Sequence, residues 1–232
     1  MANLCIIPAR GGSKRIPNKN IKNFLGKPII AYSIETALKS GLFDEVMVST
    51  DSAEIADVSR EFGAIVPFNR SGKNSDDYAT TSDVILEVIE SYKAKLSREF
   101  EYVCCIYPTA PFISVENLTK AYDLMCLEKR STVFPTVRYA YPIQRSLKWS
   151  DKLGNIEFVW PEYAQTRSQD LDERYHDAGQ FYWINVDKFK SQPTLISENT
   201  SSILMKEIEV QDIDNISDWK IAELKYEALR SS

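Results

Sequence analysis

Short apolar runs alternate with amphipathic helical patterns through the first half of the chain, and this alternation restricts the folds open to it. The strand-type runs are residues 4–7, 46–48, 65–66, 102–107 and 133 onward. Helical patterns between them are predicted to begin near Pro28, Asp51, Thr81 and Ser114. Repeated strand–helix units predict an α/β fold: a Rossmann-like, mostly parallel sheet with helices on both faces. In such sheets, ligands bind beyond the carboxyl ends of the strands.

Residues 139–175 break this rhythm. The stretch contains Trp149, Trp160, a turn signal at 151–154 and few helical features. We expect an inserted β arm whose aromatic side chains form a dimerisation subdomain, and the alternative is that they pack back onto the core. The chain then returns in a predicted strand over 180–185 and ends in a helix over 217–230. One domain over 1–232, with the arm as its insertion, is therefore expected.

Composition and charge narrow the class of partner. The chain has 28 Lys and Arg against 33 Asp and Glu, giving a net charge of −5. A polyanion such as nucleic acid is therefore disfavoured as the main partner. The sequence shows no signal-peptide pattern and no apolar stretch that could cross a bilayer, so a cytoplasmic protein without a membrane partner is expected. A single histidine, His176, excludes a multi-histidine metal site within one chain.

The loop after the first strand is the most informative segment. It reads Pro8-Ala9-Arg10-Gly11-Gly12-Ser13-Lys14-Arg15-Ile16-Pro17-Asn18-Lys19-Asn20. Its glycines allow the backbone to approach a ligand closely, and successive N–H groups can form an anion-binding nest. Its four basic side chains suit the charge of a triphosphate. The loop is neither a Walker A motif nor a G-x-G-x-x-G fingerprint, so it predicts a nucleotide or phosphosugar site, with an exposed basic turn as the alternative.

This loop resembles the N-terminal signature of the CMP-sialic-acid synthetase (acylneuraminate cytidylyltransferase) family. Further matches follow in the family's order along essentially the whole chain, at 48–51, 67–70, 79–81, 107–111 and 212–214. Segments 167–171 and 176–183 are most similar to the pseudaminic acid branch of that family. The resemblance implies a fold of the nucleotide-diphospho-sugar transferase type, CTP as co-substrate, Mg²⁺ as cofactor and a homodimer.

The resemblance also implies which residues bind the nucleotide. They are Ala9, Arg10, Gly11, Gly12, Ser13, Lys19, Asn20, Arg70, Thr80 and Thr81. Hydroxyl and amide groups both donate and accept hydrogen bonds, which discrimination of cytosine from uracil requires. Two simpler roles compete with this assignment: Arg70 as a surface charge, and the threonines as the N-cap of the following helix.

Asp212 and Asp214 flank Ile213, so both carboxylates point to one face if the segment is extended. Two oxygen ligands this close suit Mg²⁺, which also takes phosphate oxygens and water. An Asp-x-Asp pair alone is common on protein surfaces, and the resemblance is what implies a metal site here. It further implies that Arg10, Lys19 and Asp212 are catalytic, with the two cations stabilising charge on the α-phosphate and the leaving group.

The resemblance implies a sugar site formed by Tyr107, Arg145, Arg167, Gln169, His176 and Gln180. Sialic-acid synthetases typically have glutamine at the position of Tyr107 and tend to have arginine at that of His176. The tyrosine removes an amide and offers a ring face, which favours a less hydroxylated, 9-deoxy sugar such as pseudaminate. Arg145, on the predicted arm, is expected to reach the sugar carboxylate in the other subunit, whereas His176 has a purely structural role as its alternative.

The implied reaction joins CTP and pseudaminate to give CMP-pseudaminate and pyrophosphate, by in-line attack of the anomeric hydroxyl on the α-phosphorus. The product would serve glycosylation of bacterial surfaces or flagellin. Three alternatives stay open. The first is another nonulosonate, N-acetylneuraminate or legionaminate. The second is a nucleotide-binding module without catalysis, and the third, weaker option is a nucleotidylyltransferase that acts on a hexose 1-phosphate.

Overall fold

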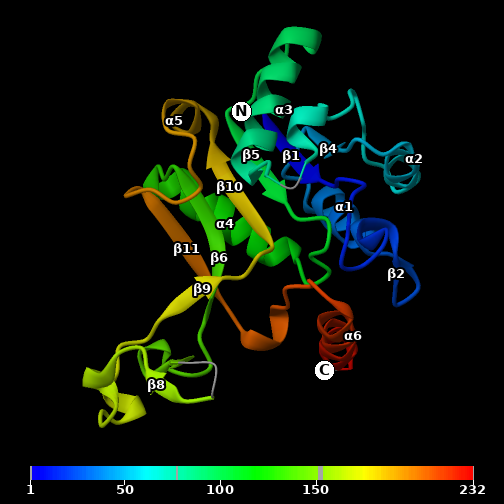
Figure 1. Ribbon diagram of the computed structural model, residues 1–232. Helices are drawn as coiled ribbons and strands as arrows, with labels where there is room; N and C mark the ends of the chain where they lie inside the picture. The colour runs from blue at the N-terminus through cyan, green and yellow to red at the C-terminus, as the bar shows by residue number, and fades with distance from the viewer. Residues whose placement is uncertain (1, 77, 151–153, 232) are drawn as a thin grey trace.

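A single main sheet organises the protein. The computed structural model describes residues 2–76, 78–150 and 154–231. The strands of the main sheet are β1 (Asn3–Pro8), β4 (Glu45–Ser49), β5 (Tyr102–Ile106), β6 (Thr132–Arg138), β9 (Tyr175–Asp177), β10 (Phe181–Asn185) and β11 (Thr200–Met205). Their order is β11–β6–β10–β5–β1–β4, and β9 pairs with β6 outside this path (Figure 1).

The sheet is mostly parallel, as predicted from the sequence. β1 runs parallel to β4 and β5, and β11 runs parallel to β6, whereas β10 is antiparallel to both β5 and β6. Every residue of β5 is buried, which explains its continuous apolar run. The reversal of β10 follows from β9, which brings the chain back antiparallel along β6 and leads directly into β10.

The strand predicted at Ile65-Val66 is the main correction to the sequence-based fold. Ile65 forms only an isolated parallel bridge with Met47 in β4, supported by the hydrogen bond from Val48 N to Ile65 O. Pro67 follows at once, and proline has no N–H with which to continue a ladder. The edge of the sheet therefore receives one bridge instead of a strand.

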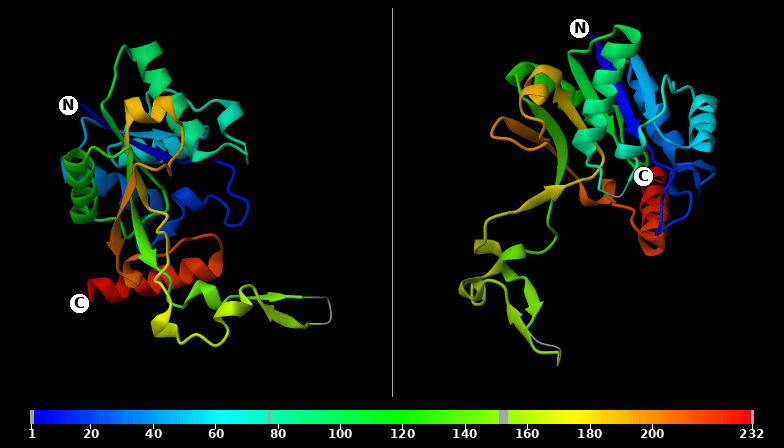
Figure 2. Two further views of the ribbon diagram at one scale, coloured as in Figure 1. Left: turned by 90° about the vertical axis from the view of Figure 1, so that its left-hand side faces the viewer. Right: turned by 45° about the horizontal axis from the view of Figure 1, so that its top comes forward.

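Helices cover both faces of the sheet. They are α1 (Ile29–Ser40), α2 (Ala53–Glu61), α3 (Thr81–Leu96), α4 (Val115–Glu128), α5 (Val186–Ser191) and α6 (Ile216–Arg230). Alternate residues of β1 face opposite layers: Cys5 and Ile7 pack with side chains of α1, α2 and α4, while Leu4 and Ile6 pack with those of α3 and α5. Figure 2 shows α1 to α5 in layers on the two sides of the sheet, with α6 beside its edge.

A third apolar cluster fixes the C-terminal part of the chain beside the start of α1. Ile213, Trp219 and Ala222 pack with Phe24 and Tyr32. Ile213 is fully buried, so the segment that enters α6 is anchored between its two aspartates. Asn215 then caps α6 by accepting hydrogen bonds from the N–H groups of Ser217 and Asp218.

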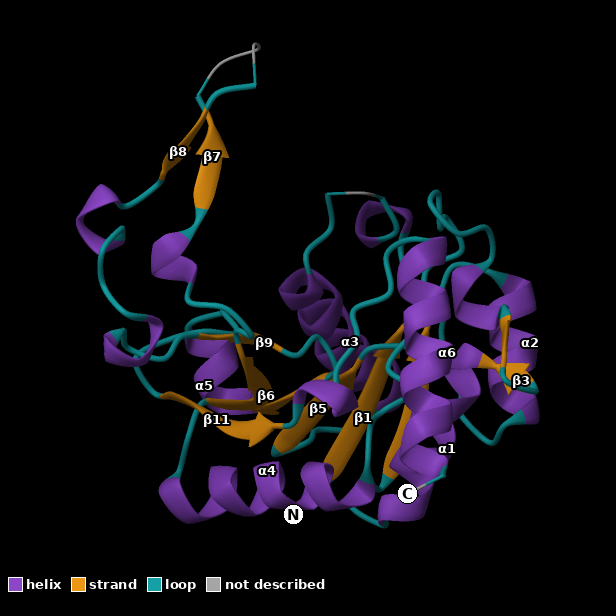
Figure 3. Ribbon diagram, turned by 90° about the horizontal axis from the view of Figure 1, so that it is seen from below, coloured by secondary structure: helices purple, strands orange, loops and turns teal. Residues whose placement is uncertain are grey.

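Residues 139–174 leave the sheet after β6 and return in β9, and we call this segment the arm. The arm contains the antiparallel pair β7 (Leu147–Trp149) and β8 (Ile156–Phe158), while residues 151–153 of the predicted turn lie outside the described part of the chain. Figures 2 and 3 show the arm projecting away from the sheet. Its aromatic side chains do not pack onto the core: Trp149 is 73% exposed.

The remaining elements are short. They are β2 (Asn23–Phe24), β3 (Lys27–Pro28) and the 3-10 helices η1 (Lys19–Ile21), η2 (Gly72–Asn74), η3 (Ile143–Arg145), η4 (Pro161–Tyr163), η5 (Ser168–Asp170) and η6 (Glu207–Glu209). Among the residues that the structure describes, no helix has the length and apolar character needed to cross a bilayer.

Candidate active site

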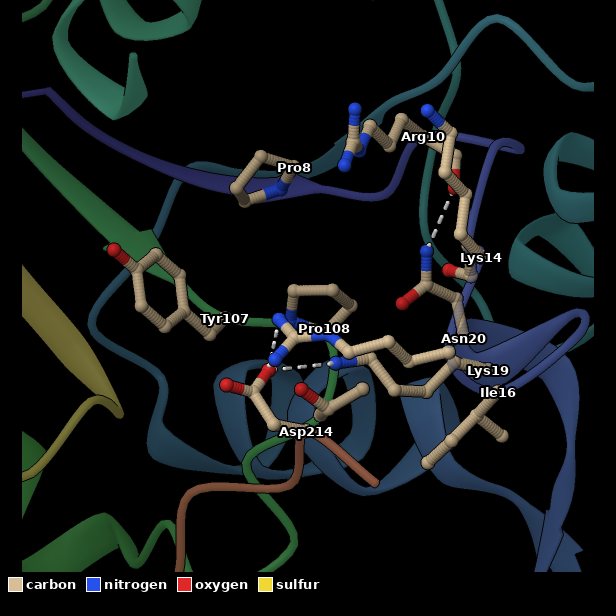
Figure 4. Close-up of a pocket in the computed structure, with 12 residues that line it drawn as sticks. Pro8, Arg10, Lys14, Ile16, Lys19, Asn20, Tyr107, Pro108 and Asp214 are labelled. Atoms are coloured by element: carbon tan, nitrogen blue, oxygen red, sulfur yellow. Dashed lines mark hydrogen bonds and ion pairs between the residues drawn. The ribbon is translucent and has the colours of Figure 1, made fainter. Parts of the chain in front are cut away.

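A cavity of about 230 Å³ opens where β1 and β5 end. Its lining comes from the loop after β1, from residues 107–109 after β5, and from Asp214 before α6. Figure 4 shows Arg10 and Lys14 on one side of this cavity and Lys19 beside Asp214 on the other. The cavity lies at the carboxyl edge of a parallel sheet, which is where the predicted phosphate loop was expected to act.

The loop after β1 is held by hydrogen bonds from several directions. Gly11 N donates to Asp51 Oδ1 at 2.9 Å, and Asn20 Nδ2 donates to Arg10 O at 2.9 Å. Arg10 Nη1 donates to Asp76 O at 2.8 Å. Asp51 was predicted to cap α2, but Ser52 caps it, which leaves the Asp51 carboxylate for the loop. Its position at the end of the second parallel strand was a sequence signal for this role that the prediction missed.

The two glycines of the loop have different surroundings, which gives a testable prediction. A Cβ added at Gly11 would lie 3.2 Å from the Ser52 Cβ, whereas one added at Gly12 would meet nothing within 4 Å. Ser52 cannot yield freely because it caps α2. We expect Gly11→Ala to reduce the free energy of unfolding in urea by about 1 kcal/mol and Gly12→Ala to leave it unchanged. Equal stabilities for the two variants would contradict this packing argument.

Lys19 lies at the junction of the loop and the acidic residues. Its Nζ donates to Ile213 O at 2.7 Å and lies 4.0 Å from Asp214 Oδ1. Burial lowers the pKa of Lys19, and the nearby carboxylates of Asp214 and Asp212 oppose this shift. Arg15 Nη2 donates to the same Asp214 oxygen at 2.8 Å. Two basic side chains and two carboxylates thus lie close together at one end of the cavity. This arrangement suits a phosphate ligand that binds together with a metal ion.

Asp212 and Asp214 meet the requirements of a Mg²⁺ site that is completed by the substrate. Both flank the buried Ile213, and their carboxylates are near enough that Asp214 raises the pKa of Asp212, although desolvation is the larger cause. A divalent cation would relieve both effects. No group of three acidic, histidine or cysteine side chains in the described residues could hold a metal alone. Two carboxylates with further oxygens from phosphates and water match the usual coordination of Mg²⁺.

Arg70 and Thr80 are engaged within the protein. Arg70 is 8% exposed and donates from Nη2 to Ser49 O at 2.8 Å and from Nε to Ser49 Oγ at 3.1 Å. Thr80 is the N-cap of α3, in a reciprocal capping box with Asp83. Arg70 is therefore a buried side chain that is hydrogen-bonded to the last residue of β4. The alternative prediction, that Arg70 is a surface charge, is wrong. The capping role weighed for Thr80 is the one observed.

Thr81, Tyr107 and Gln180 lie together at the end of β5. The hydroxyls of Thr81 and Tyr107 are 3.2 Å apart, and Tyr107 N donates to Gln180 O at 2.8 Å. Burial raises the pKa of Tyr107, so its phenol stays neutral at physiological pH. Gln180 is 3% exposed, and its Oε1 has no hydrogen-bond partner among the described residues. Gln180 lines neither the cavity at the end of β1 nor the cavity that contains His176, so this acceptor lies behind the cavity walls.

His176 lies in a second cavity, of about 310 Å³, which it lines with Arg138, Asp212 and Lys225. The imidazole Nδ1 is 2.9 Å from Asp177 O, and the ring lies against Tyr139 with centroids 4.7 Å apart. Asp212 therefore lines one cavity and Asp214 the other. Arg138 and Lys225 were absent from the predicted site, and no sequence motif marked them.

The other predicted sugar residues are not brought to these cavities within one chain. Arg145, Arg167 and Gln169 lie on the arm, which Figure 3 shows apart from the sheet edge. Arg167 is paired with Asp170 at 2.7 Å, and Arg145 Nη1 is 3.4 Å from Ser168 Oγ. Gln169 lines a separate cavity of about 300 Å³ at the base of the arm. The six predicted sugar residues therefore lie in two groups: three on the main body (Tyr107, His176 and Gln180) and three on the arm (Arg145, Arg167 and Gln169).

Comparison with known proteins decides the family. Residues 4–146 match the family described as cytidylyltransferase. A pseudaminic acid cytidylyltransferase of Campylobacter jejuni is 41% identical over 100% of this chain and 99% of its own length. This chain belongs to the cytidylyltransferase family. The predicted resemblance to CMP-sugar synthetases is thereby confirmed, and the enzyme is a nucleotidyltransferase.

One further relative and one solved structure complete the comparison. A CMP-N,N'-diacetyllegionaminic acid synthase of Legionella pneumophila is 37% identical over 97% of this chain and 98% of its own. A solved CMP:2-keto-3-deoxy-manno-octonic acid synthetase complexed with CTP covers 100% of both chains with a TM-score of 0.69 at 17% identity. That structural likeness confirms the predicted α/β fold.

Proposed function

We propose that this cytidylyltransferase converts CTP and pseudaminate to CMP-pseudaminate and pyrophosphate. The observation that carries the proposal is the 41% identity, over the full length of both chains, to the pseudaminic acid cytidylyltransferase of Campylobacter jejuni. A second enzyme of that activity, from another strain of the species, is 40% identical over the same span. The cavity at the end of β1, lined by basic residues and one carboxylate, suits a nucleoside triphosphate.

In the proposed reaction the triphosphate lies along the loop after β1. The main-chain N–H of Gly12 and the hydroxyl of Ser13 bind phosphate oxygens, while Arg10 and Lys19 neutralise charge on the α-phosphate and the departing pyrophosphate. The anomeric hydroxyl of the sugar attacks the α-phosphorus in line, its proton passes to solvent, and the bond to the β-phosphate oxygen breaks. Asn20 and Ala9 position the nucleotide end of this arrangement.

Asp212 and Asp214 would hold the Mg²⁺. When bound, the ion neutralises phosphate oxygens and makes the attacking hydroxyl more acidic. Asp214 must then exchange its contact with Arg15 for the ion, which leaves Arg15 available to the triphosphate in the same cavity. The aspartates thus link the nucleotide cavity, lined by Asp214, with the second cavity, lined by Asp212 and His176.

The second cavity is the proposed position of the sugar. Tyr107 offers a ring face at the edge of the first cavity, and His176 and Arg138 offer polar groups in the second cavity. Arg145, Arg167 and Gln169 would complete the site from the arm of a second copy of this chain. The exposed apolar side chains of β7 and β8, including Trp149 and Ile156, support such a homodimer.

The test of the substrate is pyrophosphate release with CTP and Mg²⁺ against pseudaminate, legionaminate, N-acetylneuraminate and 3-deoxy-manno-octulosonate. We expect kcat/KM for pseudaminate to exceed that for N-acetylneuraminate by at least about 100-fold, because the ring of Tyr107, in place of an amide, leaves an extra sugar hydroxyl unpaired. Tyr107→Gln should lower this ratio of the two kcat/KM values. Tyr107→Phe, which keeps the ring, is the matched control.

A preference for legionaminate would keep the chemistry and overturn the substrate. That second candidate is favoured by one observation, the 37% identity to the Legionella pneumophila synthase over nearly the whole of both chains. Binding of CTP without turnover of any sugar would instead favour the nucleotide-binding module.

A further inference from the structure

Lys225 holds the segment that carries the two aspartates. We call residues 207–214 the acidic segment. Lys225 projects from α6, and its Nζ donates to Val210 O at 2.8 Å and to Glu207 O at 3.2 Å. The two carbonyls lie on either side of a turn in the acidic segment, so one ammonium fixes both.

The acidic segment has little other means of fixing its shape. It contains η6 but no strand, and its last four residues lie in no helix or strand. Gln180 Nε2 donates to Glu209 O at 2.7 Å, and Lys19 Nζ donates to Ile213 O at 2.7 Å. Side chains from three separate parts of the fold therefore satisfy carbonyls that a regular element would have satisfied by itself.

We propose that Lys225 is a positioning residue that sets the approach of Asp212 to the metal through the backbone of the acidic segment. Lys19 also lines the nucleotide cavity and Lys225 lines the second cavity, but Lys225 makes its two hydrogen bonds to main-chain oxygens only two and five residues before Asp212. Ile213, buried in the third cluster, fixes the segment on the other side of Asp212. Asp212 is thus held between one apolar anchor and one charged anchor.

The inference rests on the proposed metal role of Asp212 and Asp214. Residues that orient metal ligands typically change metal affinity by about 10- to 100-fold when they are replaced. Removal of the ammonium should therefore weaken the response to metal more than the binding of CTP, because the loop after β1 makes no contact with Lys225 in the hydrogen bonds described.

The test compares Lys225→Met, which keeps the aliphatic stem, with Lys225→Arg, which keeps the donors. Lys220→Met removes an equal charge from an exposed position of the same helix and is the matched control. Two quantities are measured: the Mg²⁺ concentration for half-maximal pyrophosphate release at saturating CTP, and Mn²⁺ binding to the sugar-free enzyme by electron paramagnetic resonance. We expect Lys225→Met to raise the half-maximal Mg²⁺ concentration and the Mn²⁺ dissociation constant each by about tenfold. Lys225→Arg should recover most of the lost metal affinity, and Lys220→Met should match the wild type.

Lys225→Met with the metal response of Lys220→Met would overturn the inference. If Lys225→Met does not fold, Lys225→Ala, which also has no donor, takes its place, and an unchanged metal response in that variant overturns the inference equally. Asp212→Asn serves as the reference. If its metal response is also unchanged, the proposed metal role fails, whereas a lost response in Asp212→Asn with a normal one in Lys225→Met defeats only the role of Lys225.

Discussion

Asp212→Asn is expected to lower kcat by roughly 100- to 1000-fold, as loss of a group that acts on transition-state charge does. The carboxylate lines the second cavity, the proposed position of the sugar, and is near enough to Asp214 for that charge to raise its pKa. Binding of CTP should persist, because the basic loop after β1 is untouched. The measurement is pyrophosphate release together with equilibrium binding of CTP.

The same substitution is expected to stabilise the metal-free protein. Desolvation, followed by the charge of Asp214, raises the pKa of Asp212 above its ordinary value. For an acid whose pKa is raised by folding, ionisation opposes the folded state, and this penalty is fully present at pH 7, above the folded-state pKa. Asparagine removes it, so the thermal midpoint at pH 7 with chelator should rise. The gain should shrink as the pH falls through the raised pKa toward the ordinary pKa of aspartate.

Glu227→Gln removes an equal charge from an exposed position of α6 and should change neither turnover nor the midpoint. The paired result, less activity with more stability, separates a functional carboxylate from a structural one. Retained turnover in Asp212→Asn would remove this residue from the reaction. Lost turnover together with a lowered midpoint would mean that Asp212 supports the fold instead.

Mixing two defective variants is expected to restore activity if the arm acts on a second copy of the chain. Arg145→Met damages only the arm, and Asp212→Asn damages only the body. A mixed dimer would have one site in which both residues are intact, so random exchange of subunits should return about a quarter of wild-type turnover. The measurement is the rate after the two proteins are mixed and allowed to exchange, against each protein alone.

The physical reason is the placement of the predicted sugar residues in two groups. Arg145 and Arg167 lie on the arm, while Lys19 and Asp214 lie at the edge of the sheet (Figure 3). If the arm served its own body, neither protein would supply an intact site and mixing would give no gain. Lys148→Met, another charge removal on the arm, should leave turnover unchanged in the same assay, because Lys148 pairs only with Glu157 of the neighbouring strand in the salt bridges described.

Much of the main sheet was predictable because its strands are apolar on both faces. β1 and β5 are continuous apolar runs, and each is followed by a helix whose apolar residues recur at helical spacing. The reversal of β10 was not predictable, since an antiparallel strand buried in the centre of a sheet has the same composition as a parallel one. A strand was predicted at Ile65-Val66, but only a single bridge forms there because Pro67 has no N–H with which to continue the ladder.

The residues of the candidate site were likewise predictable only in part. The loop after β1 was predictable because its glycines and basic residues are contiguous in sequence. Asp51 was missed although it follows the end of a parallel strand, whereas Arg138 and Lys225 were missed because each reaches the site from another element and no local motif marks such a contact.

The fold class and the family could be inferred from the amino-acid sequence alone, since they depend on periodicity and on residues that are neighbours along the chain. Which side chains meet could be established only from the folded structure. In that structure Asp51 accepts a hydrogen bond from Gly11, Arg70 donates to Ser49, and Lys225 donates to carbonyl groups that precede Asp212. Each of these contacts satisfies a polar group that folding removes from water, and the available partner depends on which elements the apolar core brings together.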